Sequence, residues 1–387
     1  MSSILGTYAR KPISFTKGEG SYLYTEKGEK YLDFVQGIAT NILGHCHKHL
    51  VNAIQEQSKK LWHVSNAFTI SEQEKLAKRL TENTFADFVC FQNSGSEATE
   101  ASIKIARKYF HSINKPEKNR IITFEGAFHG RTLAALFAAN NPKHTEGFGP
   151  KVDGFDQVPF ADHEAMKKVI TDNTAAIMVE TIMGEGGIKV LPDFCIKGLR
   201  ELCDKHDMLL ILDEVQSAYR TGNFFAFEKS GITPDIVPIA KGIGGGFPLG
   251  ACLVTKKVSS GMTPGSHGST FGGNPLAMAA GNAVLDIILK KDFFKNVKEK
   301  GEYFQKGLIK IKENHSKIIE EIRGAGLIKG LKMLVNNDEF IQKLSDHKML
   351  AIKASENVIR LFPPLIVSKQ ELDEALEKIE KVCKEMS

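Results

Sequence analysis

Two residues in the middle of the chain have types and positions that could do chemistry together. Asp213 ends the apolar run 208–212, and Lys241 follows a second apolar segment, 236–240, just before a glycine-rich stretch. A buried carboxylate can keep a ring nitrogen protonated, and a lysine can hold an aldehyde as a Schiff base, which are the two needs of a pyridoxal phosphate enzyme. Each motif alone also fits a simpler interpretation, a solvated strand end for Asp213 and a glycine-capped helix end for Lys241.

A possible phosphate site precedes this pair. The motif NSGSEA at 93–98 stands between a β-rich apolar run and an amphipathic segment, so it should begin a helix. The free amides of a first helical turn bind anions, which makes Gly95 and Ser96 candidates for holding a phosphate. An ordinary helix N-cap would have the same sequence.

Three glycine-containing segments carry further candidate groups. In the segment 126–131, Phe128 could stack on a cofactor ring or fill the core, and Arg131 could bind a carboxylate. His129 beside them fits a structural hydrogen bond as well as proton transfer. In the segment 184–187, Glu185 is a lone acid among glycines, suited to the mouth of a pocket. The loop 268–275 offers the hydroxyls of Ser269 and Thr270, which could cap a phosphate or the helix that follows.

Composition limits the class of protein. With 387 residues the chain should form two domains, and its 42% hydrophobic and 25% charged residues are typical of a globular enzyme. The formal charge of +5 is spread over interleaved lysines and acids, which argues against a nucleic-acid partner. There is no signal-peptide pattern and no membrane-spanning apolar run, so we expect a cytoplasmic protein without membrane contact.

Cysteines and histidines suggest no metal or disulfide chemistry. The six cysteines lack CxxC spacing, as expected for reduced, mostly buried thiols. The alternating His45, His47 and His49 resemble a metal cluster, but no second group of ligands has matching spacing, so we expect no metal.

The order of elements indicates the fold. From about residue 88 to 255, short β-rich runs alternate with helical stretches, which predicts a largely parallel sheet covered on both faces. Ligands bind such sheets beyond the carboxyl ends of the strands, where every motif above lies. A hairpin pattern at 21–34 and long charged helices after 274 predict a smaller α+β domain built from both ends of the chain. We therefore expect a large domain over 46–274 and a small one over 1–45 together with 275–387.

Ten sequence blocks together resemble one family, the class III, fold-type I pyridoxal phosphate aminotransferases, over nearly the full length. The blocks are LGHCH at 43–47, LWHVSN at 61–66, NSGSEA at 93–98, AFHGR at 127–131, GFGP at 147–150, GEGG at 184–187, LDEVQ at 212–216, AKGIGGGFPLGA at 240–251, HGSTFGGNPLA at 267–277 and RGAGL at 323–327. The resemblance implies a mixed, mostly parallel seven-stranded sheet and a homodimer with shared active sites.

The same resemblance implies roles for individual residues. Lys241 would anchor the cofactor and act as acid and base, Asp213 would pair with the ring nitrogen, and Gln216 would bind the ring hydroxyl. Gly95 and Ser96 would hold the phosphate together with Thr270 of the partner subunit, and Phe128 would stack on the ring. Arg131 and Ser269 would contact an acylated amino-acid donor. Arg360 would bind the α-carboxylate of glutamate or 2-oxoglutarate, and Glu185 would shield Arg360 when another substrate binds.

The expected reaction moves the terminal amine of N2-acetyl-L-ornithine to 2-oxoglutarate, giving N-acetyl-L-glutamate 5-semialdehyde and L-glutamate. LWHVSN at 61–66 favours acetylornithine over ornithine, because ornithine-specific relatives tend to have a tyrosine in this region. N-succinyl-L,L-diaminopimelate is the nearest alternative donor, followed by 4-aminobutyrate or ornithine, and an aminomutase is the alternative from another class. Thr181, Met183 and a shortened loop after Gln216 depart from the family pattern and leave the acyl group open.

Overall fold

The computed structural model describes residues 3–387, and its centre is a seven-stranded sheet. The strand order is β4-β12-β11-β10-β7-β5-β6, and only β12 runs against the others. The strands are β4 (Phe88–Gln92), β5 (Arg120–Phe124), β6 (Phe155–Val158), β7 (Thr174–Glu180), β10 (Leu209–Asp213), β11 (Ile236–Ile239) and β12 (Gly250–Val254). The predicted mixed, mostly parallel seven-stranded sheet is confirmed.

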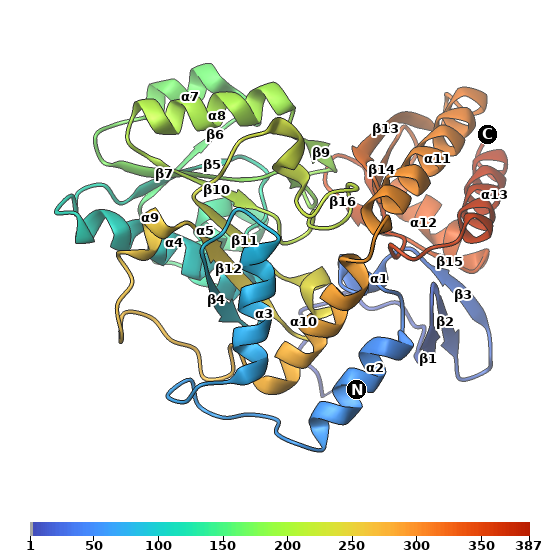
Figure 1. Cartoon of the computed structure of the whole chain (residues 1–387). Coiled ribbons are helices and arrows are strands. Elements are labelled where there is room, and N and C mark those ends of the chain that lie inside the picture. The colour runs from blue at the N-terminus through green and yellow to red at the C-terminus, as the bar shows by residue number, and fades with distance from the viewer. Residues whose placement is uncertain (1–2) are drawn as a thin grey trace.

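Helices cover both faces of this sheet (Figure 1). Helices α4 (Gly95–Ser112), α5 (Leu133–Ala139) and α9 (Lys256–Ser259) lie on one side, and α7 (His163–Val169) and α8 (Asp193–Lys205) lie on the other. Strand β10 is fully buried, and its alternate side chains enter different cores: Leu209 and Ile211 pack with α4, whereas Leu210 and Leu212 pack with α8. Burial on both faces explains why this strand is an uninterrupted apolar run.

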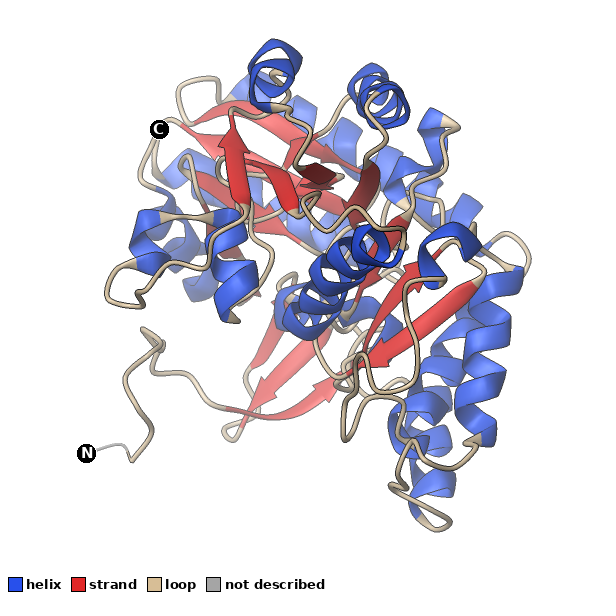
Figure 2. Cartoon of the chain, turned by 90° about the vertical axis from the view of Figure 1, so that its left-hand side faces the viewer, coloured by secondary structure: helices blue, strands red, loops and turns tan. Residues whose placement is uncertain are grey.

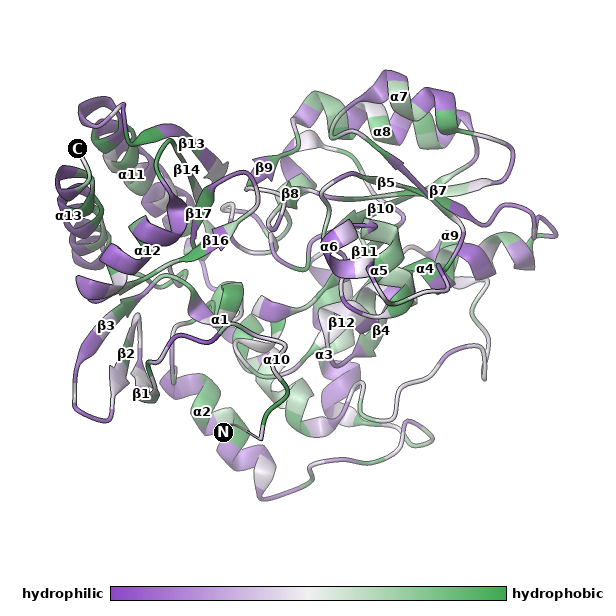
Figure 3. Ribbon diagram, turned by 180° about the vertical axis from the view of Figure 1, so that it is seen from behind, coloured by the Kyte–Doolittle hydropathy of each residue, from purple (hydrophilic) through white to green (hydrophobic). Residues whose placement is uncertain are grey.

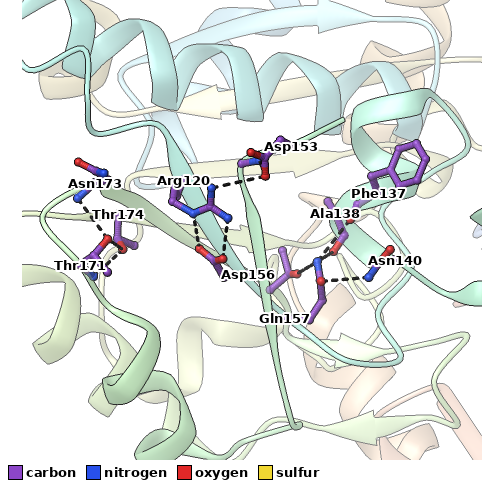
Figure 4. A network of polar contacts seen from close by, with 12 residues as sticks. Arg120, Phe137, Ala138, Asn140, Asp153, Asp156, Gln157, Thr171, Asn173 and Thr174 are labelled. Atoms are coloured by element: carbon purple, nitrogen blue, oxygen red, sulfur yellow. Dashed lines mark hydrogen bonds and ion pairs between the residues drawn. The ribbon is translucent and has the colours of Figure 1, made fainter. Parts of the chain in front are cut away.

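The edge strand β6 lacks the continuous apolar run of the central strands, because half of its residues are polar. Its Asp156 carboxylate accepts two hydrogen bonds from the guanidinium of Arg120 on β5, at 2.9 and 2.7 Å. Gln157 donates its side-chain amide to the carbonyl of Ala138 at 3.1 Å, which ties the strand to α5 (Figure 4). Polar side chains therefore attach this strand to its neighbours, and the apolar run that marks the other strands is interrupted here.

A smaller part of the molecule combines the two ends of the chain. One sheet has the order β1-β2-β3-β15, in which N-terminal β3 pairs with C-terminal β15. A second has the order β13-β14-β17-β16, and helices α11, α12 and α13 lie beside these sheets (Figures 1 and 3). The bounds are β1 (Phe15–Glu19), β2 (Tyr22–Thr25), β3 (Lys30–Asp33), α11 (Phe293–Asn314), β13 (Ile319–Ala325), β14 (Ile328–Met333), α12 (Asn337–Asp346), β15 (Met349–Leu350), β16 (Ile352–Ala354), β17 (Val358–Leu361) and α13 (Lys369–Glu385). The exact domain boundaries stay a prediction.

The remaining elements are three helices and several short segments. Helix α10 (Pro275–Ile288) packs against α2 (Lys48–Ser58) and α3 (Ser71–Glu82). The short elements are α1 (Gln36–Ala39), α6 (Pro142–Thr145), β8 (Ile182–Met183), β9 (Lys189–Val190), η1 (Ala226–Ser230) and η2 (Lys241–Gly244). Residues 3–14, which precede β1, form a coil with no helix or strand (Figure 2). Over the described residues, no helix combines the length and apolar character needed to cross a membrane.

Candidate active site

A cavity of about 360 Å³ lies beyond the carboxyl ends of the central strands. Its wall includes seven of the predicted site residues: Gly95, Ser96, Phe128, Glu185, Asp213, Gln216 and Lys241. These residues come from five separate segments of the chain, at or just beyond the carboxyl ends of β4, β5, β7, β10 and β11. The common edge of the sheet is what brings them together.

Asp213 is held by two neighbours at the bottom of this cavity. Its Oδ2 lies 2.8 Å from Nδ1 of His129, and its Oδ1 accepts a hydrogen bond from the amide of Val215 at 3.0 Å. His129 is itself buried, and although burial alone would lower its pKa, the hydrogen bond and charge of Asp213 raise the pKa overall. The contact supports the structural interpretation of His129, which is to orient the carboxylate.

Glu180 is a second acid in this cavity, and the sequence reasoning did not select it. It ends β7 directly opposite Asp213 in the parallel pairing with β10, is 6% exposed, and accepts hydrogen bonds from the amides of Phe128 and Gly184. Burial raises the pKa of Glu180 to about 7, and the charge of Asp213 adds to the effect. An acid that ends an all-apolar strand beside the strand of Asp213 was the signal available in the sequence.

Lys241 enters the same cavity from the end of β11. Its backbone has a φ of 50°, a left-handed conformation that is uncommon for a residue with a Cβ and that starts the short helix η2. Burial lowers the pKa of its amine to about 8. A larger fraction of the amine is therefore neutral near physiological pH than in an ordinary lysine, and only the neutral form is a nucleophile or base.

The start of α4 forms an anion site on the cavity wall. Ser94 caps the helix by accepting a hydrogen bond from the amide of Glu97 at 3.2 Å, and Gly95 and Ser96 are the first two residues of the helix. The amides of a first helical turn have no acceptor within the helix, so they can point at a bound phosphate. A Cβ on Gly95 would approach Val215 to 2.8 Å, so the close packing here requires glycine.

The features of this cavity fit pyridoxal phosphate group by group. The helix start suits the phosphate, the carboxylate of Asp213 suits the ring nitrogen, the amine of Lys241 suits the aldehyde, and the ring of Phe128 offers an apolar face. Within the described chain, the buried Oε1 of Gln216 has no hydrogen-bond partner, which leaves this side chain available to a ligand. The predicted cofactor therefore has a partner for each of its polar groups.

A second cavity, of about 1150 Å³, adjoins the first, and Phe128 and Glu185 line both. Arg131 and Arg360 are in its wall. Arg360 is buried on β17; one nitrogen lies 2.5 Å from the carboxylate of Glu185, and the other donates to the carbonyl of Lys353 at 2.9 Å. Two guanidinium groups near the Lys241 cavity are suited to bind carboxylates.

Ser269 and Thr270 lie away from the Lys241 cavity. Ser269 lines a third cavity, of about 690 Å³, where its hydroxyl accepts hydrogen bonds from the side chain of Asn93 and the amide of Gly272. Thr270 is exposed and is absent from the walls of the first two cavities. Within one chain, neither hydroxyl reaches the site that the family resemblance implies for it.

The LWHVSN block at 61–66 meets these cavities only through its last residue. Residues 61–65 line none of the three cavities, and Trp62 is 64% exposed, whereas Asn66 lines the third cavity and donates to the carbonyls of Ser269 and Gly272. The segment that does reach the large cavity near Phe128 includes Gly37 and Ile38 of α1, which the sequence reasoning did not consider. Of the departures from the family pattern, Met183 is buried outside both cavities, and Thr181 is buried and donates to Glu214 at 2.8 Å.

Comparison with known proteins agrees with the geometry. The family model described as Aminotransferase class-III matches residues 6–383. The acetylornithine aminotransferase of Agrobacterium fabrum is 55% identical over 378 residues, which are 97% of this chain and 95% of that protein. The ornithine aminotransferase structure from Toxoplasma gondii with partial occupancy of pyridoxal phosphate has a TM-score of 0.94 at 30% identity, covering 98% of this chain and 92% of that one. The N-acetylornithine aminotransferase structure from Stenotrophomonas maltophilia has a TM-score of 0.86 at 32% identity, covering 98% of this chain and 97% of that one. The chain belongs to the class III aminotransferases, a family of pyridoxal phosphate-dependent enzymes.

Proposed function

We propose that the enzyme transfers the terminal amino group of N2-acetyl-L-ornithine to 2-oxoglutarate, as a step of arginine biosynthesis. The observation that carries this proposal is the pair of guanidinium groups, Arg131 and Arg360, in the cavity that adjoins Lys241. The donor has one carboxylate and an acylated α-amine, and the acceptor has two carboxylates. Relatives such as the Agrobacterium fabrum protein carry the name acetylornithine aminotransferase, which supports the same donor.

The residues of the cavity have separate tasks in this mechanism. Bound pyridoxal phosphate supplies an electron sink for the bond that breaks next to the substrate nitrogen. Lys241 would anchor the cofactor through its aldehyde. Once released, its neutral amine would act as the base that takes the proton from the substrate carbon bearing the transferred amine, and then as the acid that gives the proton up on the other side of that nitrogen. Asp213, oriented by His129 at 2.8 Å, holds the proton on the ring nitrogen. Gly95 and Ser96 bind the phosphate, Gln216 binds the ring hydroxyl, and Phe128 covers the ring.

Arg360 and Glu185 distinguish the two substrates. With Glu185 paired to Arg360, the site presents less positive charge and accepts the ω-amine end of the donor. When 2-oxoglutarate binds, its α-carboxylate must replace the carboxylate of Glu185 at the guanidinium of Arg360, because the two carboxylates cannot occupy the same place. The position of Glu185 on a loop that lines both cavities allows this exchange.

Arg131 is the proposed contact for the carboxylate at the acylated end of the donor. Its guanidinium lies 5.4 Å from the centre of the Phe128 ring, so it borders the cofactor cavity while facing the larger one. Ser269 stays a proposed contact to this donor, although it would need to act from outside the two main cavities of its own chain.

N-succinyl-L,L-diaminopimelate is the second candidate donor. Besides Arg131, the larger cavity has Lys11 in its wall, and its volume of about 1150 Å³ leaves room for a longer, acidic acyl group. The two donors differ in the charge of the acyl group, which these cationic side chains can sense.

We also propose a homodimer in which Thr270 reaches the phosphate of the partner subunit. Support comes from its exposed position and from large exposed aromatic side chains, among them Trp62 at 64%, Phe68 at 67% and Phe271 at 58%. Mixing Lys241→Ala and Thr270→Ala chains tests the sharing, because a hybrid dimer would contain one site with both changes and one intact site. Recovery of activity on mixing is expected, and no recovery contradicts shared sites. The cytoplasmic location stays a prediction.

A panel of donors with 2-oxoglutarate tests the substrate. Glutamate formation is measured with N-acetylornithine, N-succinyl-diaminopimelate, ornithine and 4-aminobutyrate, and kcat/KM values are compared. The proposal predicts the highest kcat/KM for N-acetylornithine and a loss of about tenfold or more in Arg131→Ala, the typical value of a charged hydrogen bond. A higher value for ornithine or 4-aminobutyrate contradicts it.

A further inference from the structure

Arg220 is a buried arginine that the mechanism does not use. It lies on the loop that follows β10, downstream of Asp213 and Gln216, and it is 0% exposed. It forms no ion pair with any described residue, and its Nε has no hydrogen-bond partner there. Burial lowers the pKa of its guanidinium to about 9, which still leaves it charged near neutral pH. A buried cation without a carboxylate is costly, so its contacts need an explanation.

The guanidinium of Arg220 binds three backbone carbonyls from the smaller part of the molecule. Nη1 donates to Leu327 at 3.2 Å and to Pro363 at 3.1 Å, and Nη2 donates to Ala39 at 3.2 Å. The backbone of Arg220 also accepts a hydrogen bond from the amide of Leu327 at 2.8 Å. Because all three carbonyl residues are buried, loss of the guanidinium would leave polar groups without water to replace it.

Two of these carbonyls mark one end of the strand pair that carries Arg360. Leu327 immediately precedes β14, and Pro363 follows β17, its antiparallel partner. Arg360 stands on β17 opposite Gly330 of β14, so it lies within the same short ladder. A single nitrogen of Arg220 therefore holds the two strands together at the end next to the large sheet.

An aromatic ring connects the two arginines more directly. The guanidinium carbon of Arg220 lies 5.5 Å from the centre of the Phe362 ring, and that of Arg360 lies 5.7 Å from the same centre. Phe362 is fully buried and directly follows β17, and its amide donates to the carbonyl of Phe34 at 2.7 Å. The position of Phe362 therefore depends on Arg220 on one side and bears on Arg360 on the other.

The left-handed turn of α1 is the third point of attachment. Gln36, Ile38 and Ala39 have φ values of 48°, 59° and 67°, which are unfavourable for residues with a Cβ, above all for the β-branched Ile38. Such a turn persists only where its surroundings hold it. The hydrogen bond from Arg220 to Ala39 holds the end of the turn, between Ile38 of the large cavity and Thr40 of the small one.

We propose that Arg220 is a positioning residue for substrate carboxylates: it sets the place of Arg360 relative to the cofactor loop without touching substrate. This inference rests on the proposed role of Arg360. Lysine in place of Arg220 would keep the charge but could not reach three carbonyls in fixed directions, because it lacks the planar fork.

Binding of glutarate to the cofactor-loaded enzyme tests the proposal without turnover. Glutarate has both carboxylates of 2-oxoglutarate and no reactive carbonyl, and its dissociation constant follows from the change in cofactor absorbance. Arg220→Lys should weaken glutarate binding by about tenfold, as expected for loss of a charged hydrogen-bond network, with the affinity for pyridoxal phosphate changed less than about threefold. Arg200→Lys is the matched control, since Arg200 is a largely buried arginine paired with Asp235, away from both main cavities. It should lower the melting temperature and leave glutarate affinity within about twofold.

A double-mutant cycle with Arg360→Ala separates positioning from general stability. If Arg220 acts through Arg360, Arg220→Lys should change glutarate affinity less than about twofold in the Arg360→Ala background. The same loss in both backgrounds, or no loss in either, contradicts the inference. If Arg360→Ala alone leaves glutarate binding unchanged, the proposed role of Arg360 fails instead. If Arg220→Lys does not fold, Phe362→Leu takes its place in the cycle. It should weaken glutarate binding by about threefold in the wild-type background and less than that in the Arg360→Ala background. An equal loss in both backgrounds, or no loss in either, again contradicts the inference.

Discussion

Asp213 and Glu180 stand opposite each other at the carboxyl ends of the parallel strands β10 and β7. Both are buried, and Nδ1 of His129 lies 2.8 Å from the Asp213 carboxylate. Two carboxylates this close to each other cannot both be ionised without cost, so the one with fewer compensating charges keeps its proton to a higher pH. This relationship leads to a prediction about pH.

The unfolding free energy of the cofactor-free protein should depend on the ionisation of Glu180. Its pKa is about 7 in the folded chain and 4.5 for an unperturbed glutamate. The folded state therefore binds more protons between these values, and the stabilisation present below pH 4.5 is lost as pH rises to about 7. We expect Glu180→Gln to lose this dependence, so that its unfolding free energy relative to wild type rises by about 1–3 kcal/mol from pH 5 to pH 8. Urea unfolding of both proteins at the two pH values measures the difference; a constant difference contradicts the prediction.

The amine of Lys241 should control how fast the cofactor-free protein takes up pyridoxal phosphate. Only the neutral amine attacks an aldehyde, and burial lowers the pKa of this amine to about 8. The association rate should therefore rise about tenfold per pH unit below 8 and level off above it, rather than continuing to rise toward 10. Stopped-flow absorbance gives the rate, and Lys241→Ala, which should also lose turnover by at least about 10³-fold, is the control.

Removing the charge of Asp213 should reduce catalysis while retaining the fold. Asn in its place can still contact His129 and the amide of Val215, but it cannot hold a proton on the ring nitrogen. We expect Asp213→Asn to lower kcat by about 10²–10³-fold, with a melting temperature near that of wild type. A kcat within about threefold of wild type would show that ring protonation does not depend on this carboxylate.

Glu185→Gln should strengthen the binding of dicarboxylates. The change keeps the size of the side chain but removes the negative charge of the carboxylate, whose Oε1 lies 2.5 Å from Nη1 of Arg360. The KM for 2-oxoglutarate should fall by about threefold or more, because the acceptor no longer competes with an internal carboxylate. Steady-state kinetics with varied 2-oxoglutarate at saturating donor measure this value. An increase in KM would mean that Glu185 helps to hold the acceptor instead of competing with it.

Much of the cofactor cavity could be predicted because its residues lie at the ends of strands that are visible in the sequence. Asp213 and Lys241 follow apolar runs, and Gly95 and Ser96 follow another at a helix start. Parallel strands place such ends at one edge of the sheet, so local patterns were enough to bring these residues together. Strand β6 has no apolar run to mark it in the sequence, because an ion pair and an amide hydrogen bond attach it to its neighbours at the edge.

The sequence by itself determined the family, the seven-stranded sheet and the residues that line the cofactor cavity, since each depends on local pattern or on motifs in a fixed order. Only the tertiary structure decided which distant groups meet. Strand register set Glu180 beside Asp213, and packing of the two parts set Arg220 against Pro363 and Phe362. The same packing placed the LWHVSN block, residues 61–66, outside the two main cavities and Ile38 in the wall of the larger one. Contacts across long stretches of chain depend on how whole elements pack, and no local pattern records that geometry.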